Sequence, residues 1–296
     1  MNEIPELMNR LSKKNCFNGT YEQGVSIYKS TENHERQPLL YKQGIIFVGQ
    51  GSKRVYLSSK EYLYSSNNYL VLATSLPVEC EAYATEEEPF LALFLEINMP
   101  MISQIISDMN EESDCLFSDP VGQPKSLLLA SATIDINDTL LRLLRVLNSS
   151  VESRILASGL VKELLFRVIQ GEGGAIIRDL VFNNTNLAKI NRVLKIIHED
   201  FCKPINIDNL ANIANMSTSS FHRAFKDVTT TTPIQYLKKI RLNNAKNLII
   251  EKNIRVNQAA RLVGYESTNQ FSREFKKYFG CSPKNARNIF LPPSAT

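Results

Sequence analysis

Residues 217–233 read STSSFHRAFKDVTTTTP, and residues 267–283 read STNQFSREFKKYFGCSP. The second stretch repeats the first at an offset of 50 positions. The shared residues are Phe221, Arg223, Phe225, Lys226 and Pro233 in the first copy and Phe271, Arg273, Phe275, Lys276 and Pro283 in the second. Repetition at a fixed spacing indicates one structural unit used twice.

Each copy predicts two short helices separated by a tight turn. The first helix of each pair has one packed face of small and apolar residues, which are Ile207, Leu210, Ala211 and Ala214 in the first copy and Val256, Ala259, Ala260 and Val263 in the second. Asn215-Met216 and Gly264-Tyr265 are the expected turns, and Ser217 is a suitable cap for the helix that follows. This pattern is typical of a helix-turn-helix that fits a DNA major groove.

A longer helix is predicted between the two copies. Thr232-Pro233 is a typical helix start, with a hydroxyl cap followed by proline at the first helical position. A helix from there to Glu251 has about 18 residues and a length of about 27 Å. Since one turn of B-DNA is roughly 34 Å, one chain could place two reading helices in successive major grooves.

These residues resemble the DNA-binding domain of the AraC/XylS family of bacterial transcription regulators. The similarity extends over about 80 residues and includes Leu210-Ala211, Met216-Ser217, Phe225-Lys226, Tyr236-Leu237, Arg241-Leu242, Ala245, Val256, Ala260, Val263-Gly264-Tyr265, Gln270-Phe271-Ser272-Arg273, Phe275-Lys276, Phe279-Gly280 and Ser282-Pro283. The chain departs from the family pattern at Thr230, Ala259 and Ala286-Arg287, and the last departure leaves the packing of the final helix open.

The groove-facing positions of the second helices are predicted to contact DNA. The residues expected to contact bases are Ser219, Ser220, His222, Arg223, Thr268, Asn269, Ser272 and Arg273, which match the base-reading positions of the family. The residues expected to contact phosphates are Ser217, Lys226, Ser267, Lys276 and Lys277. Arginine can bond bidentately to guanine and asparagine to adenine, while a solvated surface is the alternative for any single residue.

The charge is divided unevenly along the chain. Of 34 Lys and Arg and 30 Asp and Glu residues, 18 basic and 7 acidic residues lie from Asn184 onward, a net of +11. The preceding residues carry a net of −7. This split favours a polyanionic partner for the C-terminal part, which we expect to be double-stranded DNA bound in a salt-dependent way.

Residues 1–183 are predicted to form a separate domain. The expected strands are Gly44–Val48, Arg54–Ser59, Tyr69–Thr74, Val78–Ala84 and Phe90–Ile97. The region resembles the cupin-like N-terminal domain of one branch of the AraC family, through Tyr28, Leu40-Tyr41, Gly51-Ser52-Lys53-Arg54-Val55, Tyr69-Leu70-Val71, Leu76-Pro77-Val78 and Pro89-Phe90-Leu91-Ala92-Leu93. Residues 49–53 are expected to form a hairpin turn rather than a phosphate loop, because a strand-like sequence follows.

A metal-centred barrel is not expected, since the only histidine of this domain, His34, lies in a predicted polar loop. If the barrel has an effector pocket, the candidate lining residues are Phe47, Tyr56, Leu72, Cys80 and Phe94. Cys80 could instead be a reactive sensor, although an inert buried thiol is the simpler interpretation.

Leucine-rich helices follow the strands, at Asp138–Leu147 and Val151–Ile169. A leucine stripe usually packs into a core, and the alternative here is a dimer seam that uses Leu140, Leu144 and Leu147. A polar break at residues 181–186 is the candidate linker, and residues 184–296 are the predicted DNA-binding domain. His198 in the next helix is expected to be structural.

Composition agrees with a protein of two globular domains in the cytoplasm. The chain of 296 residues is 43% hydrophobic and 22% charged, and it contains five scattered cysteines without a CxxC pair. It has no run of 18 apolar residues, so we expect no membrane partner, and Met1 to Lys14 is expected to be an amphipathic helix rather than a signal peptide.

The sequence therefore predicts an α+β protein that combines a cupin-like β-barrel and flanking helices with an all-α domain of two helix-turn-helix units joined by a long helix. We expect a DNA-binding regulator, controlled by a small molecule in the barrel, without a cofactor or catalytic residues. The alternative is a ligand-independent regulator whose first domain serves only oligomerisation, for example as a homodimer. The family resemblance also implies activation through contact with RNA polymerase.

Overall fold

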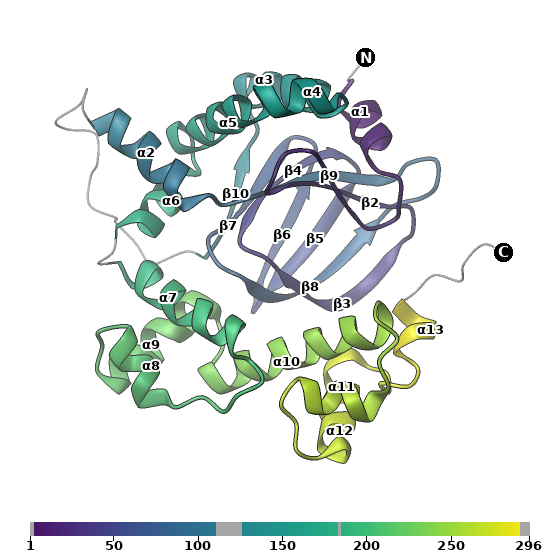
Figure 1. Cartoon of the computed structure of the whole chain (residues 1–296), viewed down its shortest axis with the longest axis vertical. Helices are drawn as coiled ribbons and strands as arrows, with labels where there is room; N and C mark the ends of the chain where they lie inside the picture. Colours follow the sequence, from purple (N-terminus) through teal and green to yellow (C-terminus); the bar gives the residue numbers. More distant parts are fainter. Residues whose placement is uncertain (1–2, 111–125, 183–184, 291–296) are drawn as a thin grey trace. The chain divides into compact units, whose positions relative to one another are not determined.

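The computed structural model describes residues 3–110, 126–182 and 185–290. The chain divides into two units, the first containing most residues up to Ala188 and the second containing Lys189–Thr296 together with the short segments Gln37–Tyr41 and Pro77–Glu79. Strands and helices form the first unit and helices dominate the second, which confirms the predicted α+β class (Figure 1). The predicted break at residues 181–186 lies between helices α6 and α7, just before this division.

The first unit is built on two facing sheets. The six-stranded sheet has the order β1-β2-β9-β4-β7-β10, with β1 Phe17–Gly19, β2 Val25–Ser30, β9 Phe90–Glu96, β4 Gly44–Gln50, β7 Asn68–Leu72 and β10 Leu127–Ser131. The four-stranded sheet has the order β3-β8-β5-β6, with β3 His34–Tyr41, β8 Leu76–Tyr83, β5 Ser52–Leu57 and β6 Lys60–Ser65. The cupin-like architecture is confirmed, but the described strands form two sheets rather than one closed barrel.

The five predicted strands correspond to β4, β5, β7, β8 and β9, whereas β1, β2, β3, β6 and β10 were not predicted. Strand β3 was missed because it reads HERQPLLY, in which polar residues and a proline obscure the alternation. His34 therefore lies in this strand and not in a loop, and its Nε2 atom is 3.1 Å from the Ser30 hydroxyl.

The hairpin predicted at residues 49–53 is wrong. Strand β4 pairs with β7 and β9, whereas β5 pairs with β6, so this connection carries the chain from one sheet to the other. Gly51 lies in this connection with a φ of 77°, and a Cβ atom there would lie 3.1 Å from Cα of Phe90. The glycine was correctly associated with a turn, but the turn joins two sheets.

The two faces of the six-stranded sheet have different neighbours. Phe47 pairs with Tyr69 on the face toward the helices, where the Tyr69 hydroxyl accepts a hydrogen bond from the Gly173 N–H at 3.3 Å. Phe90 on the opposite face contacts Tyr64 of the other sheet, with ring centroids 6.2 Å apart. The space between the sheets is thus lined by alternate residues of each strand.

This arrangement corrects part of the predicted effector pocket. Leu72, Cys80 and Phe94 are buried on faces that line the space between the sheets. Phe47 packs toward the helices instead, and Tyr56 lies on the outer face of the second sheet, where its hydroxyl donates to Glu81 at 3.0 Å. Strand alternation alone did not identify the inner face, because residues on both sides of the larger sheet are buried.

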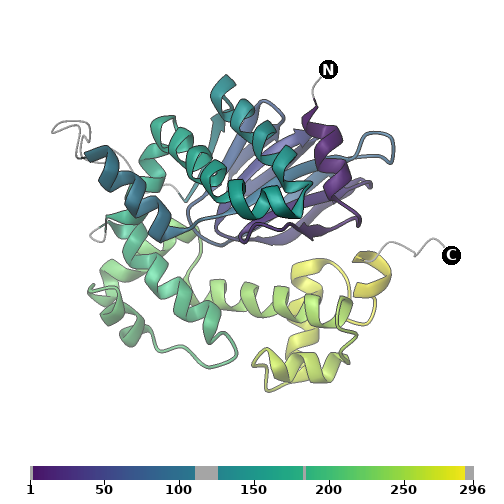
Figure 2. The same ribbon diagram turned by 45° about the horizontal axis from the view of Figure 1, so that its top comes forward.

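Helices cover the outer face of the six-stranded sheet, as Figure 2 shows. The helical segments of the first unit are α1 Ile4–Leu11, α2 Met99–Asn110, α3 Ile134–Leu147, α4 Ser150–Glu152, η1 Ser153–Ala157, α5 Ser158–Gln170 and α6 Gly174–Val181. The side chains of Leu140, Leu144 and Leu147 are at most 2% exposed. They belong to the core of the unit, so the proposed dimer seam cannot use them, and the core interpretation is correct.

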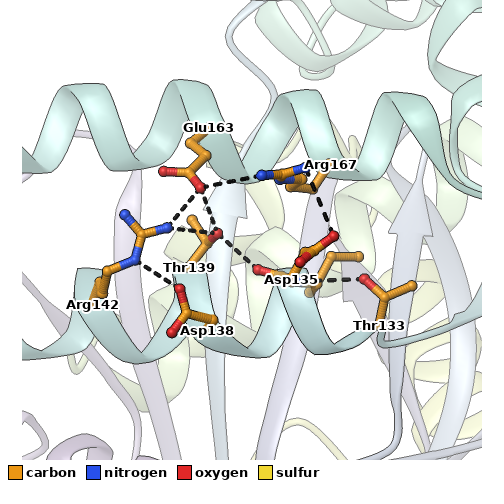
Figure 3. Close-up of polar contacts among 8 residues, drawn as sticks. Thr133, Asp135, Asp138, Thr139, Arg142, Glu163 and Arg167 are labelled. Atoms are coloured by element: carbon orange, nitrogen blue, oxygen red, sulfur yellow. Dashed lines mark hydrogen bonds and ion pairs between the residues drawn. The ribbon is translucent and has the colours of Figure 1, made fainter.

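Polar side chains join α3 to α5 along one edge of their packed faces (Figure 3). Arg142 of α3 donates to Asp138 at 2.9 Å and to Glu163 of α5 at 2.6 Å. The Thr139 hydroxyl lies 3.1 Å from the same Glu163 oxygen. Arg167 of α5 reaches back to Asp135 of α3 at 3.7 Å. These contacts fix the register of two helices whose leucines are buried beneath them.

Replacing Glu163 with glutamine should reduce the acid sensitivity of the first unit. The hydrogen bond from Arg142 lowers the pKa of Glu163, so the carboxylate stabilises the fold above its ordinary pKa, and this contribution is lost as pH falls through the folded-state pKa. We expect Glu163→Gln to lower stability at pH 7 by roughly 0.5–1 kcal/mol, because the pair is partly exposed. Unfolding followed by circular dichroism from pH 7 to pH 3 checks this. A stability difference that stayed constant with pH would contradict it.

Apart from its two short strand segments, the second unit consists of helices that pack around buried aromatic residues. They are α7 Asn186–Glu199, α8 Ile207–Ile213, α9 Thr218–Thr229, α10 Pro233–Ile250, α11 Val256–Leu262, α12 Thr268–Phe279 and α13 Ala286–Phe290. His198 of α7 is hydrogen-bonded to the Tyr236 hydroxyl at 2.9 Å, and burial lowers the pKa of His198. The structural role predicted for this histidine is confirmed. None of the described helices combines the length and apolar character needed to cross a membrane.

The final helix packs although its sequence departs from the family pattern. Ala286 is fully buried, and Arg287 donates to the backbone carbonyl oxygen of Ile249 at 3.0 Å. Carbonyl groups at a helix C-terminus lack intrahelical partners, so Arg287 satisfies one near the end of α10.

Candidate nucleic-acid interface

The first predicted helix-turn-helix is formed by α8 and α9. Asn215 occupies the turn with a φ of 52°, a conformation that asparagine tolerates better than most residues. Ser217 caps α9 by accepting a hydrogen bond from the Ser220 N–H at 3.4 Å. Phe221 and Phe225 are fully buried, with ring centroids 5.6 Å apart. Because these rings fix one side of α9, its polar side is directed to solvent.

The second helix-turn-helix, α11 and α12, repeats this construction. Gly264 occupies the turn with a φ of 84°. Ser267 caps α12 by accepting from the Gln270 N–H at 3.2 Å. Phe271 and Phe275 are fully buried, as are their counterparts in α9. The predicted equivalence of the two copies thus extends from the caps to the buried rings.

The residues predicted to contact DNA lie on the polar faces of the two second helices or at their caps. Those that are exposed are Ser217, Ser219, Ser220, His222, Arg223, Lys226, Ser267, Asn269, Arg273, Lys276 and Lys277, while Thr268 and Ser272 are half-buried. Figure 1 shows α8 and α9 at one end of α10, and α11 and α12 at the other. The structure therefore gathers the predicted residues into two surfaces, one at each end of the same helix.

Helix α10 connects the first helix-turn-helix to the second. Its capping box combines the Thr232 hydroxyl, which accepts from the Gln235 N–H at 3.4 Å, with the Gln235 side chain, which accepts from the Thr232 N–H at the same distance. The helix has 18 residues, which corresponds to about 27 Å.

A joint between the two helix-turn-helix units centres on Arg241 of α10. Its guanidinium donates to the carbonyl oxygens of Phe201 at 2.7 Å, Lys203 at 2.9 Å and Cys202 at 3.3 Å, which lie between α7 and α8. The same group donates at 3.0 Å to the carbonyl oxygen of Gly264, which lies in the turn of the second helix-turn-helix. One half-buried side chain thus ties the segment before the first helix-turn-helix to the turn within the second helix-turn-helix.

Gly264 makes this joint possible. A Cβ atom at this position would lie 2.1 Å from the carbonyl oxygen of Cys202, far inside van der Waals contact. Glycine is therefore required both by the positive φ and by the close approach of the backbone. Sequence reasoning identified Gly264 as a turn residue but missed this contact, which is between segments distant in the sequence.

Glu274 of α12 forms a second link to α10. Its carboxylate accepts from Lys238 of α10 at 3.1 Å, from Gln270 at 3.1 Å and from the Tyr265 hydroxyl at 2.8 Å. Neither Glu274 nor Arg241 was predicted to have a role. A signal existed only for Arg241, which is a charged residue between the apolar residues Ile240 and Leu242 in a helix with a buried face.

Comparison with protein families agrees with this geometry. A family model described as the AraC-type transcriptional regulator N-terminus matches residues 22–176. A helix-turn-helix domain model matches residues 210–289. The chain belongs to the AraC family. The family resemblance predicted from the sequence is confirmed for both parts.

Several curated relatives are transcription regulators. The chain is 33% identical over 106 residues to the probable transcriptional regulator LumQ of Photobacterium leiognathi, covering 35% of this chain and 43% of LumQ. It is 40% identical over 81 residues to the activator RclR of Escherichia coli strain K12, covering 27% of this chain and 28% of RclR. The chain thus spans less than half of the length of these two relatives. The activator CfaD of Escherichia coli is 21% identical over 275 residues, covering 89% of this chain and 98% of CfaD.

Solved structures of ToxT from Vibrio cholerae share the fold of this AraC-family chain. The apo form of a ToxT variant has a TM-score of 0.62 at 10% identity and covers 90% of this chain and 98% of its own. The wild-type form bound to an unsaturated fatty acid has a TM-score of 0.59 at 12% identity and covers 90% and 94%. At these identities the likeness establishes the fold alone.

Removing one exposed lysine of α12 should weaken the salt dependence of DNA binding. If Lys276 contacts a phosphate, Lys276→Ala should reduce the slope of log affinity against log salt by about 1, because one fewer counterion is released. Titrations at several salt concentrations measure the slope. Lys60→Ala, which removes an exposed lysine of strand β6, is the matched control. Equal slopes for wild type and Lys276→Ala would remove Lys276 from the interface.

Proposed function

We propose that this AraC-family protein is a sequence-specific DNA-binding transcription regulator whose two reading helices, α9 and α12, enter neighbouring major grooves of one duplex. The observation that carries the proposal is the pair of equivalent helices with exposed polar faces, joined by α10 and the Arg241 hydrogen bonds. A rigid connection between two reading helices fixes the spacing of the half-sites that they can contact together.

The exposed arginines are the main candidates for base readout. Arg223 and Arg273 occupy equivalent positions of α9 and α12, and both side chains are exposed. A guanidinium can bond to both acceptor atoms of guanine in the major groove. Asn269 has the donor and acceptor that adenine requires, and the hydroxyl groups and His222 complete the base-reading surface. The lysines would contact phosphates and hold the register without reading sequence.

The proposed regulator is controlled by a small molecule bound in the first unit. ToxT, which shares the fold, has been solved with an unsaturated fatty acid and with (E)-4-(8-methylnaphthalen-1-yl)but-3-enoic acid. Both are acids with an apolar body, and the apolar side chains of Leu72, Cys80 and Phe94 line the interior between the two sheets of this protein. This observation favours ligand control over the alternative in which the first unit only oligomerises the protein.

Two further features of the proposed function concern partners. RclR and CfaD carry the name of activators, which supports an activating role for this chain and hence contact with RNA polymerase. A homodimer remains part of the proposal, with a seam formed by side chains other than the buried leucines of α3.

Selection of bound fragments from a random DNA pool, followed by hydroxyl-radical footprinting, tests DNA readout. We expect two protected clusters of bases on one side of the duplex, separated by about 10 base pairs. A single cluster, or protection independent of sequence, would contradict the proposal. Measuring operator affinity with and without the effector then separates ligand control from a purely oligomeric first unit, because an effector must bind two states with different affinity.

A further inference from the structure

The space between the two sheets contains a buried lysine. Lys53 of β5 is 5% exposed. Its ammonium lies over the ring of Tyr28 in β2, 4.0 Å from the centroid, and over the ring of Phe90 in β9, 4.6 Å from the centroid. The lysine thus crosses from the smaller sheet to two aromatic residues of the larger one.

The charge of Lys53 is only partly compensated. Within the described residues the ammonium contacts two ring faces and forms no ion pair with a carboxylate. Nearby acidic residues lie on the opposite face of the smaller sheet, where Glu61 and Glu81 pair with Arg54 at 2.8 Å and 3.1 Å. An aromatic face attracts a cation more weakly than an anion does, so a buried ammonium without an anion is unusual.

The surroundings of Lys53 are apolar and reach the protein surface at one edge of the sheet. Phe90 and Phe94 lie on the inner face of β9 together with Ala92 between them. Phe17 of the edge strand β1 has its ring 5.0 Å from that of Tyr28 and 6.0 Å from that of Phe94, yet it is 60% exposed. The aromatic lining therefore extends from Lys53 to solvent at this edge of the sheet.

This arrangement selects the class of ligand. One buried cation neutralises one negative charge, so a monoanion fits better than a phosphate, whose second charge would stay uncompensated in an apolar space. A carboxylate can accept a charge-assisted hydrogen bond from an ammonium, and the surrounding rings would cover an apolar body. A neutral ligand would leave the buried charge of Lys53 without a compensating anion.

We propose that Lys53 binds the carboxylate of a small organic monoacid whose apolar body lies against Phe94 and Leu72, an inference that rests on ligand control of the first unit. In this proposal the ammonium shifts from the rings of Tyr28 and Phe90 to donate a hydrogen bond to the carboxylate.

Thermal unfolding of the full chain with two acids and their matched alcohols tests the site. The probes are octanoate with octan-1-ol and 4-phenylbutanoate with 4-phenylbutan-1-ol, because each pair has the same carbon skeleton and differs in charge. At about 100 times its Kd, an acid should raise the Tm by roughly 5 °C, and the alcohols should have a smaller effect. The inference is overturned if neither acid raises the Tm at concentrations up to about 10 mM, or if the alcohols match the acids.

Three variants assign the effect to Lys53. Lys53→Met should abolish the response to the acids, Lys53→Arg should retain it, and Lys60→Met, at an exposed lysine of the adjacent strand, should behave as wild type. If Lys53→Met fails to fold, Lys53→Gln with the same probes replaces it. An unchanged acid response in a folded variant without the positive charge would overturn the inference.

Operator affinity separates this inference from the proposed function. Acid binding that depends on Lys53 but leaves operator affinity unchanged would support the site and contradict ligand control. Sequence-specific operator binding without any response to the acids would contradict the site and leave DNA-binding regulation intact.

Discussion

Gly264→Ala should destabilise the second unit considerably more than Gly280→Ala does. Both glycines have a positive φ, 84° and 77°, so both substitutions carry the cost of about 1–2 kcal/mol for a left-handed residue. Only at Gly264 does the added Cβ atom meet another backbone group, at 2.1 Å from the Cys202 carbonyl oxygen, while no heavy atom lies within 4 Å at Gly280. We expect a total loss of about 3 kcal/mol or more for Gly264→Ala.

Hydrogen exchange followed by mass spectrometry measures this difference locally. The free energy of opening should fall for peptides of α10 and α11 by a larger amount in Gly264→Ala than in Gly280→Ala. Because the Arg241 hydrogen bonds include the Gly264 carbonyl oxygen, the same variant should also lose affinity for a two-site operator more than for a single half-site. Equal loss of protection in the two glycine variants would show that the contact with Cys202 is not a constraint.

Arg273→Ala should weaken operator binding by about 1–3 kcal/mol, which is roughly a 5- to 150-fold loss of affinity. The side chain is exposed on α12, and its proposed role is bidentate bonding to guanine. A base contact contributes to the operator complex but not to the complex with random DNA, so the ratio of the two affinities should fall by a similar factor. Arg223→Ala should do the same at the other half-site, and the two losses should add because the sites are far apart.

Equilibrium binding to the selected operator and to random DNA at one fixed salt concentration checks this prediction. Lys276→Ala is the matched control, since a phosphate contact strengthens both complexes and its loss should leave their ratio nearly unchanged. If Arg273→Ala preserved the ratio, Arg273 would be assigned to phosphate binding or to solvent. If Lys276→Ala reduced the ratio as strongly as Arg273→Ala, the division between base and phosphate contacts would be wrong.

Local sequence patterns determined much of the second unit. Serine caps, turn residues with positive φ and phenylalanines one helical turn apart act within a few residues of one another, so their spacing predicted both helix-turn-helix units and the exposed face of each reading helix. The Thr232-Pro233 start of α10 is equally local and was predicted for the same reason.

The sheets were predicted less completely because strand pairing is not local. Strand β3 has a polar and proline-containing sequence, and its place beside β8 depends on a partner far along the chain. Burial on both faces of β9 hid which side chains line the space between the sheets. Sequence reasoning therefore grouped Phe47 and Tyr56 with Leu72, Cys80 and Phe94, although only the last three face the space between the sheets.

The sequence by itself determined that this protein has two equivalent helix-turn-helix units, a basic C-terminal part and an N-terminal part rich in strands, because each of these follows from composition or from contacts between near neighbours. Only the tertiary structure decided that Arg241 ties the segment before the first helix-turn-helix to the turn of the second through backbone carbonyls, that the leucines of α3 are core, and that Lys53 lies between aromatic rings. Each of these depends on which distant segments meet, and that is settled by the packing of the whole unit rather than by any local pattern.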